Sequence, residues 1–283
     1  MAALIPFLPS AAFHLARQFR SAGLWLLGPA DSVWRRVAGR EPLPPLWLRR
    51  HTGPVHLFES AAREMADRID ALGLIDAGDL VLDLGCGPGS MAACFAARIG
   101  PRGRCVGIDI HAPSIQWCRN RYRDDPRFRF ERISAFETLP VADREASFIL
   151  AKSLFTHLLE PDARRMLAEI RRVISPGRSA LLTALLFERG EGERAAASYF
   201  PFTAGSGAVR WKRRVNPKSA IAVERLRFLR WIADAGLSVD RFVPDFWPGR
   251  REPQGQDLLV VSDGTARRSA LPCPRSRLAP KTP

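Results

Sequence analysis

Three glycines at alternate positions, Gly85, Gly87 and Gly89, lie between a predicted buried strand and a predicted helix. Glycine lets the backbone turn sharply and lets a ligand approach the main chain closely. The helix that follows offers unpaired N–H groups in its first turn. Asp83 precedes the loop, and Asp109 ends the next predicted strand. A carboxylate in the second position can accept hydrogen bonds from both hydroxyls of a ribose. The pattern therefore predicts a nucleoside-binding site.

The glycine spacing separates two kinds of cofactor. A dinucleotide site favours Gly-x-Gly-x-x-Gly, whose third glycine would stand at position 90, where this chain has Ser90. Asp83 is also unfavourable beside a pyrophosphate, whereas a sulfonium cofactor that carries an ammonium group tolerates a carboxylate there. A tight strand-to-helix turn without any ligand is the other interpretation. Three glycines in five residues, followed by Asp109 at the next strand end, disfavour it.

Alternating strand and helix patterns must position these residues. Apolar or alternating runs predict strands over 79–85, 104–110, 128–134, 147–153, 179–187, 237–243 and 256–262. Apolar residues at helical spacing predict helices over 58–72, 90–99, 113–121 and 161–173, and a late helix marked by Val223, Leu226, Leu229 and Ile232.

This alternation predicts an α/β protein with a doubly wound, seven-stranded, mostly parallel sheet. The last two strands have no helix between them, so we expect them to form a terminal antiparallel hairpin at one edge. Ligands in such sheets bind beyond the carboxyl ends of the strands. The glycine loop and Asp109 both lie at that edge of the predicted sheet.

The composition limits the class of protein. The chain has 283 residues, of which 46% are hydrophobic, so it can bury a full core and is not disordered throughout. The sequence contains no run of about 18 apolar residues, which is the length that would predict a membrane-spanning helix. The five cysteines are odd in number and fit no zinc spacing, so we expect reduced thiols, no metal site and a cytoplasmic location.

The net charge is high. Lys and Arg number 43 against 29 Asp and Glu, which gives a formal net charge of +14. Such a field attracts nucleic acid, acidic lipid or phosphorylated substrates. A compositional bias toward arginine is the competing explanation, because the excess is spread along the chain.

Three zones describe the expected organisation, and the second contains an insertion. Residues 1–55 form a basic, aromatic extension, for which we expect a cap over the cofactor; the alternatives are contact of residues 1–40 with an anionic membrane surface and packing in a dimer. Residues 56–262 form the main domain. Residues 188–218 are an insertion that can act as a lid. Residues 263–283 are a basic tail predicted to be disordered.

On these motifs the chain resembles the class I S-adenosylmethionine-dependent methyltransferases, over about residues 55–262. The segments that carry the resemblance are 81–89, 106–110, 133–140, 153–158 and 168–183. More narrowly, it is similar to bacterial methyltransferases of the type 11 and type 25 kinds, through residues 115–118, 156–158, 246–249 and 255–261. The resemblance implies a Rossmann-like methyltransferase fold and S-adenosyl-L-methionine as cofactor.

The resemblance also implies a cofactor-binding set: Asp83, Gly85, Cys86, Gly87, Gly89, Asp109, Ile110, Ser134, Ala135, Phe136 and Ser153. The glycine loop and Asp83 would line the methionine part, Asp109 would bind the ribose and Ile110 would pack on the adenine. Many relatives have an aspartate for the adenine amino group where this chain has Ser134. Ala135 and Phe136 can still offer backbone and ring contacts there.

Methyl transfer to a hydroxyl usually needs a base, and His157 is the candidate because it follows the fourth predicted strand beside the cofactor edge. A packing or capping role at the start of a helix is the alternative. We expect O-methylation of a small-molecule or glycan-like acceptor, with an anionic acceptor favoured by the cations of residues 194–218. An RNA or other nucleic-acid acceptor and a non-catalytic cofactor-binding scaffold are the alternatives. The sequence leaves the oligomeric state open.

Overall fold

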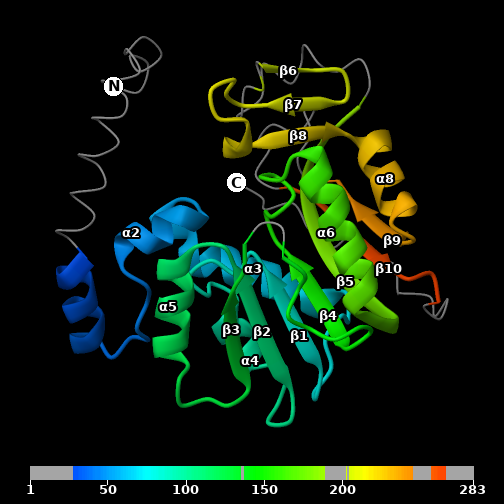
Figure 1. Ribbon diagram of the computed structural model, residues 1–283. Helices are drawn as coiled ribbons and strands as arrows, with labels where there is room; N and C mark the ends of the chain where they lie inside the picture. Colours follow the sequence, from blue (N-terminus) through cyan, green and yellow to red (C-terminus); the bar gives the residue numbers. More distant parts are fainter. Residues whose placement is uncertain (1–27, 135–136, 189–201, 203, 245–255, 266–283) are drawn as a thin grey trace, which may run out of the picture.

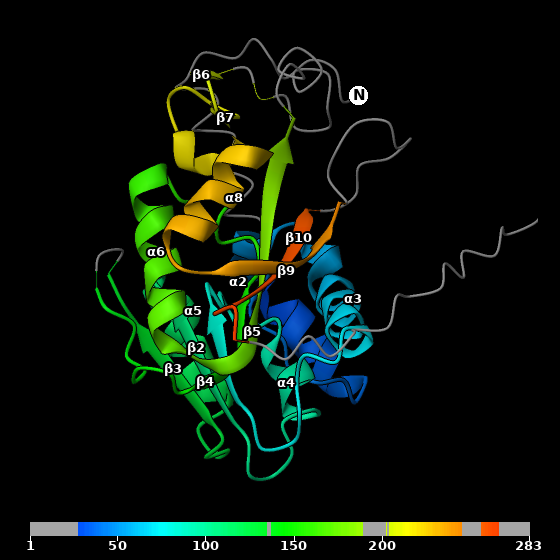
Figure 2. The ribbon, with the colours of Figure 1, turned by 90° about the vertical axis from the view of Figure 1, so that its right-hand side faces the viewer.

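A central sheet with helices on both faces forms the core of the computed structural model (Figures 1 and 2). The structure describes residues 28–134, 137–188, 202, 204–244 and 256–265. The expectations for Ala135 and Phe136, and for most of the C-terminal tail, lie outside the described residues. Among the described residues, no helix combines the length and apolar character needed to cross a membrane.

Seven strands form the expected sheet. They are β1 Leu80–Leu84, β2 Arg104–Asp109, β3 Phe128–Arg132, β4 Ala146–Ala151, β5 Ile174–Phe187, β9 Ser238–Val243 and β10 Asp257–Ser262. Their order is β3-β2-β1-β4-β5-β10-β9, with parallel pairing from β3 to β5 and antiparallel pairing of β10 with both β5 and β9. The predicted doubly wound sheet and its terminal antiparallel hairpin are therefore confirmed.

Helices cover both faces because the inner strands are apolar on both sides. The helices are α3 Phe58–Ala71, α4 Ala92–Ala96, α5 Ala112–Arg121, α6 Glu160–Val173 and α8 Arg225–Asp234. In Figure 2, α3 and α4 lie on one face and α6 and α8 on the other. Alternate residues of β1 face opposite sides of the sheet. Val81 packs with α3 and α4, whereas Leu82 packs with α6 and α8.

The insertion extends the sheet instead of forming only a loop. Its elements are β6 Ala204–Ser206, β7 Val209–Trp211, the 3-10 turn η3 Pro217–Ser219 and β8 Ile221–Glu224. The last residues of β5, 185–187, pair with 222–224 of β8, and β7 joins β8 to β6. These three strands bring the sheet to ten. A small cluster of buried residues joins the end of β5 to β8 and consists of Leu185, Phe187, Phe202, Ala220 and Ala222.

Three boundaries differ from the sequence prediction. β5 begins at Ile174 and not at 179, and α4 covers only Ala92–Ala96 of the helix predicted over 90–99. The third is the start of the late helix. Val223 was expected in the late helix, but it lies in β8, and α8 begins at Arg225. The segment 221–223 pairs with β7 on one side while its end pairs with β5 on the other. Buried β-branched residues with strand partners on both sides favour the extended conformation over another helical turn.

The described part of the extension packs on the main domain. It contains a helix over 28–37, then α2 Leu46–Arg49, η1 Arg50–Thr52 and η2 Val55–Leu57. Buried Arg49 pairs with Asp31 and donates a 2.6 Å hydrogen bond to the carbonyl of Pro44. Ion pairs join Arg35 to Glu59 of α3 and Glu41 to Arg121 of α5. The extension is thereby fixed to α3 and α5.

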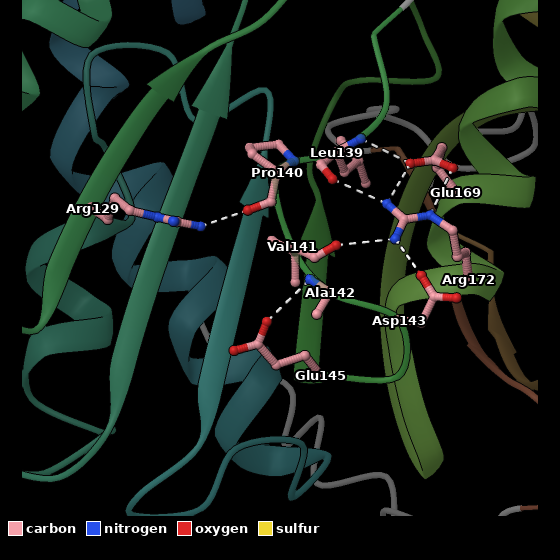
Figure 3. Close-up of polar contacts among 9 residues, drawn as sticks. All are labelled: Arg129, Leu139, Pro140, Val141, Ala142, Asp143, Glu145, Glu169 and Arg172. Atoms are coloured by element: carbon pink, nitrogen blue, oxygen red, sulfur yellow. Dashed lines mark hydrogen bonds and ion pairs between the residues drawn. The ribbon is translucent and has the colours of Figure 1, made fainter.

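A partly exposed ion-pair network holds the connection between β3 and β4 against α6 (Figure 3). The Arg172 guanidinium donates 3.0 Å hydrogen bonds to the carbonyls of Leu139 and Val141, and it pairs with Asp143 at 2.7 Å. It also pairs with Glu169 at 2.8 Å, and the Glu169 carboxylate accepts the N–H of Leu139. The hydrogen bond from Arg172 is the largest cause that lowers the pKa of Glu169.

We expect Arg172→Met to lower the free energy of unfolding by about 2 kcal/mol, because several hydrogen bonds to a charged group are lost together. Denaturant unfolding of the purified variant measures this change. Arg164→Met is the matched control on the same helix, because Arg164 forms one exposed ion pair with Asp234 and such pairs contribute about 0–1 kcal/mol. Equal effects of the two substitutions would contradict the assigned role of Arg172.

Candidate functional site

The loop after β1 has a backbone that favours glycine. Gly85, Gly87 and Gly89 have φ values of 73°, 52° and 77°, in the left-handed region where a Cβ is strained. A Cβ on Gly87 would also lie 2.8 Å from Cγ2 of Thr52, and one on Gly89 would lie 3.0 Å from Sγ of Cys118. The loop therefore has a tight turn on which the extension packs directly, through Thr52.

Asp109 connects this loop to the end of β2. Its Oδ2 accepts the N–H of Gly87 and its Oδ1 accepts the N–H of His111, each at 2.7 Å. The carboxylate is half-buried, and each oxygen retains lone-pair capacity for another donor. The next side chain, Ile110, is 61% exposed, which leaves an apolar surface beside the carboxylate. Together these groups suit a ribose and a flat base.

Asp83 is a buried carboxylate close to the same loop. Its residue is 4% exposed, and within the described parts of the chain no donor forms a hydrogen bond with its side chain. Burial raises its pKa to about 7; the positive charge of Lys152 lowers the pKa, and the negative charge of Asp109 raises it further. A cationic group of a ligand would favour the ionised form of this carboxylate.

Lys152 is a feature that the sequence reasoning missed. It follows β4 directly, and its Nζ donates a 3.3 Å hydrogen bond to the carbonyl of Ala61 in α3. Burial lowers the pKa of Lys152, while the charge of Asp83 raises it. The sequence signal was a lysine placed directly after a fully apolar strand, which predicts a charge at the carboxyl edge of the sheet.

The Cys86 side chain contributes packing beneath the loop. Its thiol is buried, and a hydrogen bond with Cys118 and burial raise its pKa well above the ordinary value. The sulfur atoms of Cys86 and Cys118 lie 3.5 and 3.6 Å from the carbonyl oxygen of Gly87. A neutral thiol held in this way is a poor nucleophile. Cys86 can therefore meet a ligand through its backbone.

Ser134 lies just beyond β3 and is exposed. Its N–H donates a 2.8 Å hydrogen bond to the carboxylate of Glu137. The structure thus adds Glu137, which sequence reasoning did not single out, to the residues around the expected adenine position. The β2–β3 register places Asp109 opposite Arg132, so the end of β3 lies at the same edge as the ribose carboxylate.

Ser153 follows Lys152 at the end of β4 and has a φ of 60°, which is unusual for a residue with a side chain.

His157, the candidate base, is exposed and lies two residues after Phe155. Its Nδ1 lies 2.8 Å from the carbonyl oxygen of Lys218. A carbonyl only accepts, so in the neutral ring the proton is assigned to Nδ1 and Nε2 keeps a lone pair. The N–H of Ile221 also donates to the carbonyl of Thr156 at 2.7 Å. His157 therefore helps to hold the insertion on the main domain.

Comparison with known proteins identifies related chains. A family model described as a methyltransferase domain matches residues 81–177. An uncharacterized methyltransferase from Mycobacteroides abscessus is 31% identical over 199 residues, which cover 65% of this chain and 73% of that protein. A demethylmenaquinone methyltransferase from Lactobacillus johnsonii is 28% identical over 102 residues, which cover 36% of this chain and 42% of that protein.

A solved structure has a similar fold. The SAM-dependent methyltransferase from Aquifex aeolicus matches with a TM-score of 0.51 at 18% identity, covering 76% of this chain and 95% of that one. Some curated relatives are matched over 39% to 42% of their own length only. The relative from M. abscessus is matched over most of its length at 31% identity. The chain thus belongs to the class I methyltransferase family, whose cofactor is S-adenosyl-L-methionine.

Proposed function

We propose that this protein transfers the methyl group of S-adenosyl-L-methionine to an oxygen atom of a small-molecule or glycan-like acceptor. The observation that carries the proposal is the half-exposed Asp109 carboxylate, which binds the N–H groups of Gly87 and His111 beside the exposed Ile110. This arrangement offers a ribose site and an adenine surface at the carboxyl edge of the sheet.

The residues at this edge fit the cofactor. Asp109 has acceptor capacity for ribose hydroxyls, and Ile110 offers an apolar surface for the adenine. Asp83 is a buried carboxylate whose pKa is raised chiefly by burial, and it suits the ammonium of the amino-acid part. Thr52 packs on Gly87, so we assign residues 28–57 the role of a cap over the bound cofactor.

The cofactor, when bound, supplies an electrophilic methyl group on a sulfonium, so the protein mainly aligns the acceptor and removes its proton. We assign proton removal to Nε2 of His157. The hydrogen bond from Nδ1 to the carbonyl of Lys218 holds the ring in the tautomer that can accept a proton at Nε2. The acceptor hydroxyl hydrogen moves to this nitrogen as the oxygen gains the methyl group.

The insertion is the proposed acceptor site. β5 extends beyond its pairing with β4 at 179–182 and pairs with β8 at 185–187, so β6, β7 and β8 extend from the carboxyl edge. Lys212, Arg213 and Arg214 follow β7 and favour an anionic acceptor. A small-molecule acceptor is also supported by the relative named demethylmenaquinone methyltransferase.

Asp109→Ala is expected to weaken binding of S-adenosylhomocysteine by about 2 kcal/mol or more, because charge-assisted hydrogen bonds to the ribose are lost. Isothermal titration calorimetry measures the affinity, and the melting temperature reports whether the loop remains folded. Asp109→Asn, which keeps one oxygen acceptor, is expected to lose less. Unchanged affinity in Asp109→Ala, or wild-type binding of a nicotinamide dinucleotide in its place, would refute the site.

Cofactor affinity is expected to rise from about pH 5.5 to about pH 7.5, because Asp83 ionises over this window and its charge pairs with the cofactor ammonium, which remains protonated there. The free energy of unfolding changes with pH in the opposite direction. A raised carboxyl pKa favours the protonated folded state, so this contribution to stability is lost as the pH rises through about 7.

Calorimetry across this pH range with wild type and Asp83→Asn checks both signs. The variant should lose the pH dependence of cofactor binding, and without cofactor it should gain melting temperature relative to wild type at the alkaline end. An equally steep pH dependence in Asp83→Asn would show that another group titrates.

His157→Ala is expected to lower turnover about 10²-fold while the affinity for S-adenosylhomocysteine is unchanged, because only proton removal is lost. The readout is release of S-adenosylhomocysteine from the cofactor in the presence of a metabolite extract. His157→Asn is the matched control, because its amide N–H can still donate to the carbonyl of Lys218 but has no basic nitrogen. Normal turnover in His157→Asn would restrict His157 to holding the insertion.

A further inference from the structure

Ser153 has an unfavourable backbone conformation at the edge of the cofactor site. Its φ of 60° lies in the left-handed region, where a side chain disfavours the conformation. Within the described residues, Arg144 is the other non-glycine residue with a positive φ. Such a conformation persists where the surroundings over-determine it, and it occurs often at functional sites.

All three polar groups of Ser153 are held by side chains from other segments. Its N–H donates to Oγ1 of Thr183 in β5 at 2.7 Å. Its carbonyl accepts the hydroxyl of Thr156 at 2.7 Å. Its Oγ accepts a hydrogen bond of 2.8 Å from Nε2 of Gln256, the residue before β10. The strained residue is therefore fixed from two neighbouring strands and from its own loop.

The hydrogen bonds form a closed ring with a defined direction. The Thr183 hydroxyl donates to Oε1 of Gln256 at 2.6 Å, so the amide oxygen faces Thr183 and the amide nitrogen faces Ser153. Thr183 has one hydroxyl hydrogen, and this bond uses it. Ser153 Oγ is an acceptor in the ring, and its own hydrogen has no acceptor in the part of the chain that the structure describes.

The ring lies at the cofactor edge. β4 pairs with β1 with Leu150 opposite Asp83, and Ser153 follows three residues later, beyond the carboxyl end of β4. Lys152, the neighbour of Ser153, acts electrostatically on Asp83. The Ser153 hydroxyl therefore lies at the same edge of the sheet as the carboxylate of Asp83, which suits the amino-acid end of the cofactor.

We propose that Thr183 and Gln256 are positioning residues that hold Ser153 so that its hydroxyl donates a hydrogen bond to the carboxylate of the bound cofactor. This inference rests on the proposed function, because it requires the cofactor to bind at this edge. Gln256, the residue before the last strand, β10, thereby has a role in cofactor binding. Gln256 lies 103 positions from Ser153 along the chain.

The test compares two ligands by calorimetry. S-adenosylhomocysteine has the amino-acid chain, whereas 5′-methylthioadenosine has the same nucleoside and thioether without it. Thr183→Val and Gln256→Leu are each expected to lower the affinity for S-adenosylhomocysteine about tenfold, which is the effect of one charge-assisted hydrogen bond. The affinity for methylthioadenosine should be unchanged. Thr183→Ser retains the hydroxyl and should restore the affinity.

Ile232→Ala is the stability control. Ile232 is buried in α8, in the core between the sheet and helices α6 and α8. It should lower the melting temperature and leave the affinities for both ligands unchanged. Wild-type affinity for S-adenosylhomocysteine in both ring variants would overturn the positioning role. Equal losses for the two ligands would also overturn it, because they would indicate a general disturbance of the site. Failure of wild type to bind either ligand would instead refute the proposed function.

Discussion

The rest of the site depends on the hydrogen bonds between the Asp109 carboxylate and two backbone N–H groups. One comes from Gly87 in the loop after β1, and the other comes from His111 at the start of α5. These bonds fix the glycine loop relative to the end of β2, and they orient the carboxylate before any ligand arrives. Preorganised acceptors lose little freedom on binding, so a small site can hold a nucleoside firmly.

Local pattern predicted most of the fold. Fully apolar runs such as β1, with glycines directly after it, indicated buried parallel strands and the loop between Gly85 and Gly89. Pairing between distant segments decides what the pattern left open. Val223 was predicted to be helical because its spacing to Leu226 suits a helix, but partners on β5 and β7 keep it extended. Propensity is a weak predictor wherever tertiary pairing competes with it.

The same distinction applies to the site. Asp83 and Asp109 were predictable because each lies at the end of a strand that the sequence identifies. Thr52 and Gln256 were not, since their significance arises only when the chain brings them beside the loop or beside Ser153. A single sequence contains no signal for such long-range contacts, whereas strand ends and glycine turns are local.

The strands added at the end of β5 differ in how closely they are packed onto the rest of the protein, and this difference decides which of their residues can be substituted. Leu185 and Phe187 of β5 pack with Phe202, Ala220 and Ala222 in a small cluster. Ile221 and Val223 of β8, however, belong to the main core that also contains Leu82 of β1. Among the described residues of β6 and β7, Val209 is the one that packs against this main core. Most residues of β6 and β7 can therefore diverge among related proteins at little cost to the stability of the main sheet, whereas the buried residues of β8 cannot.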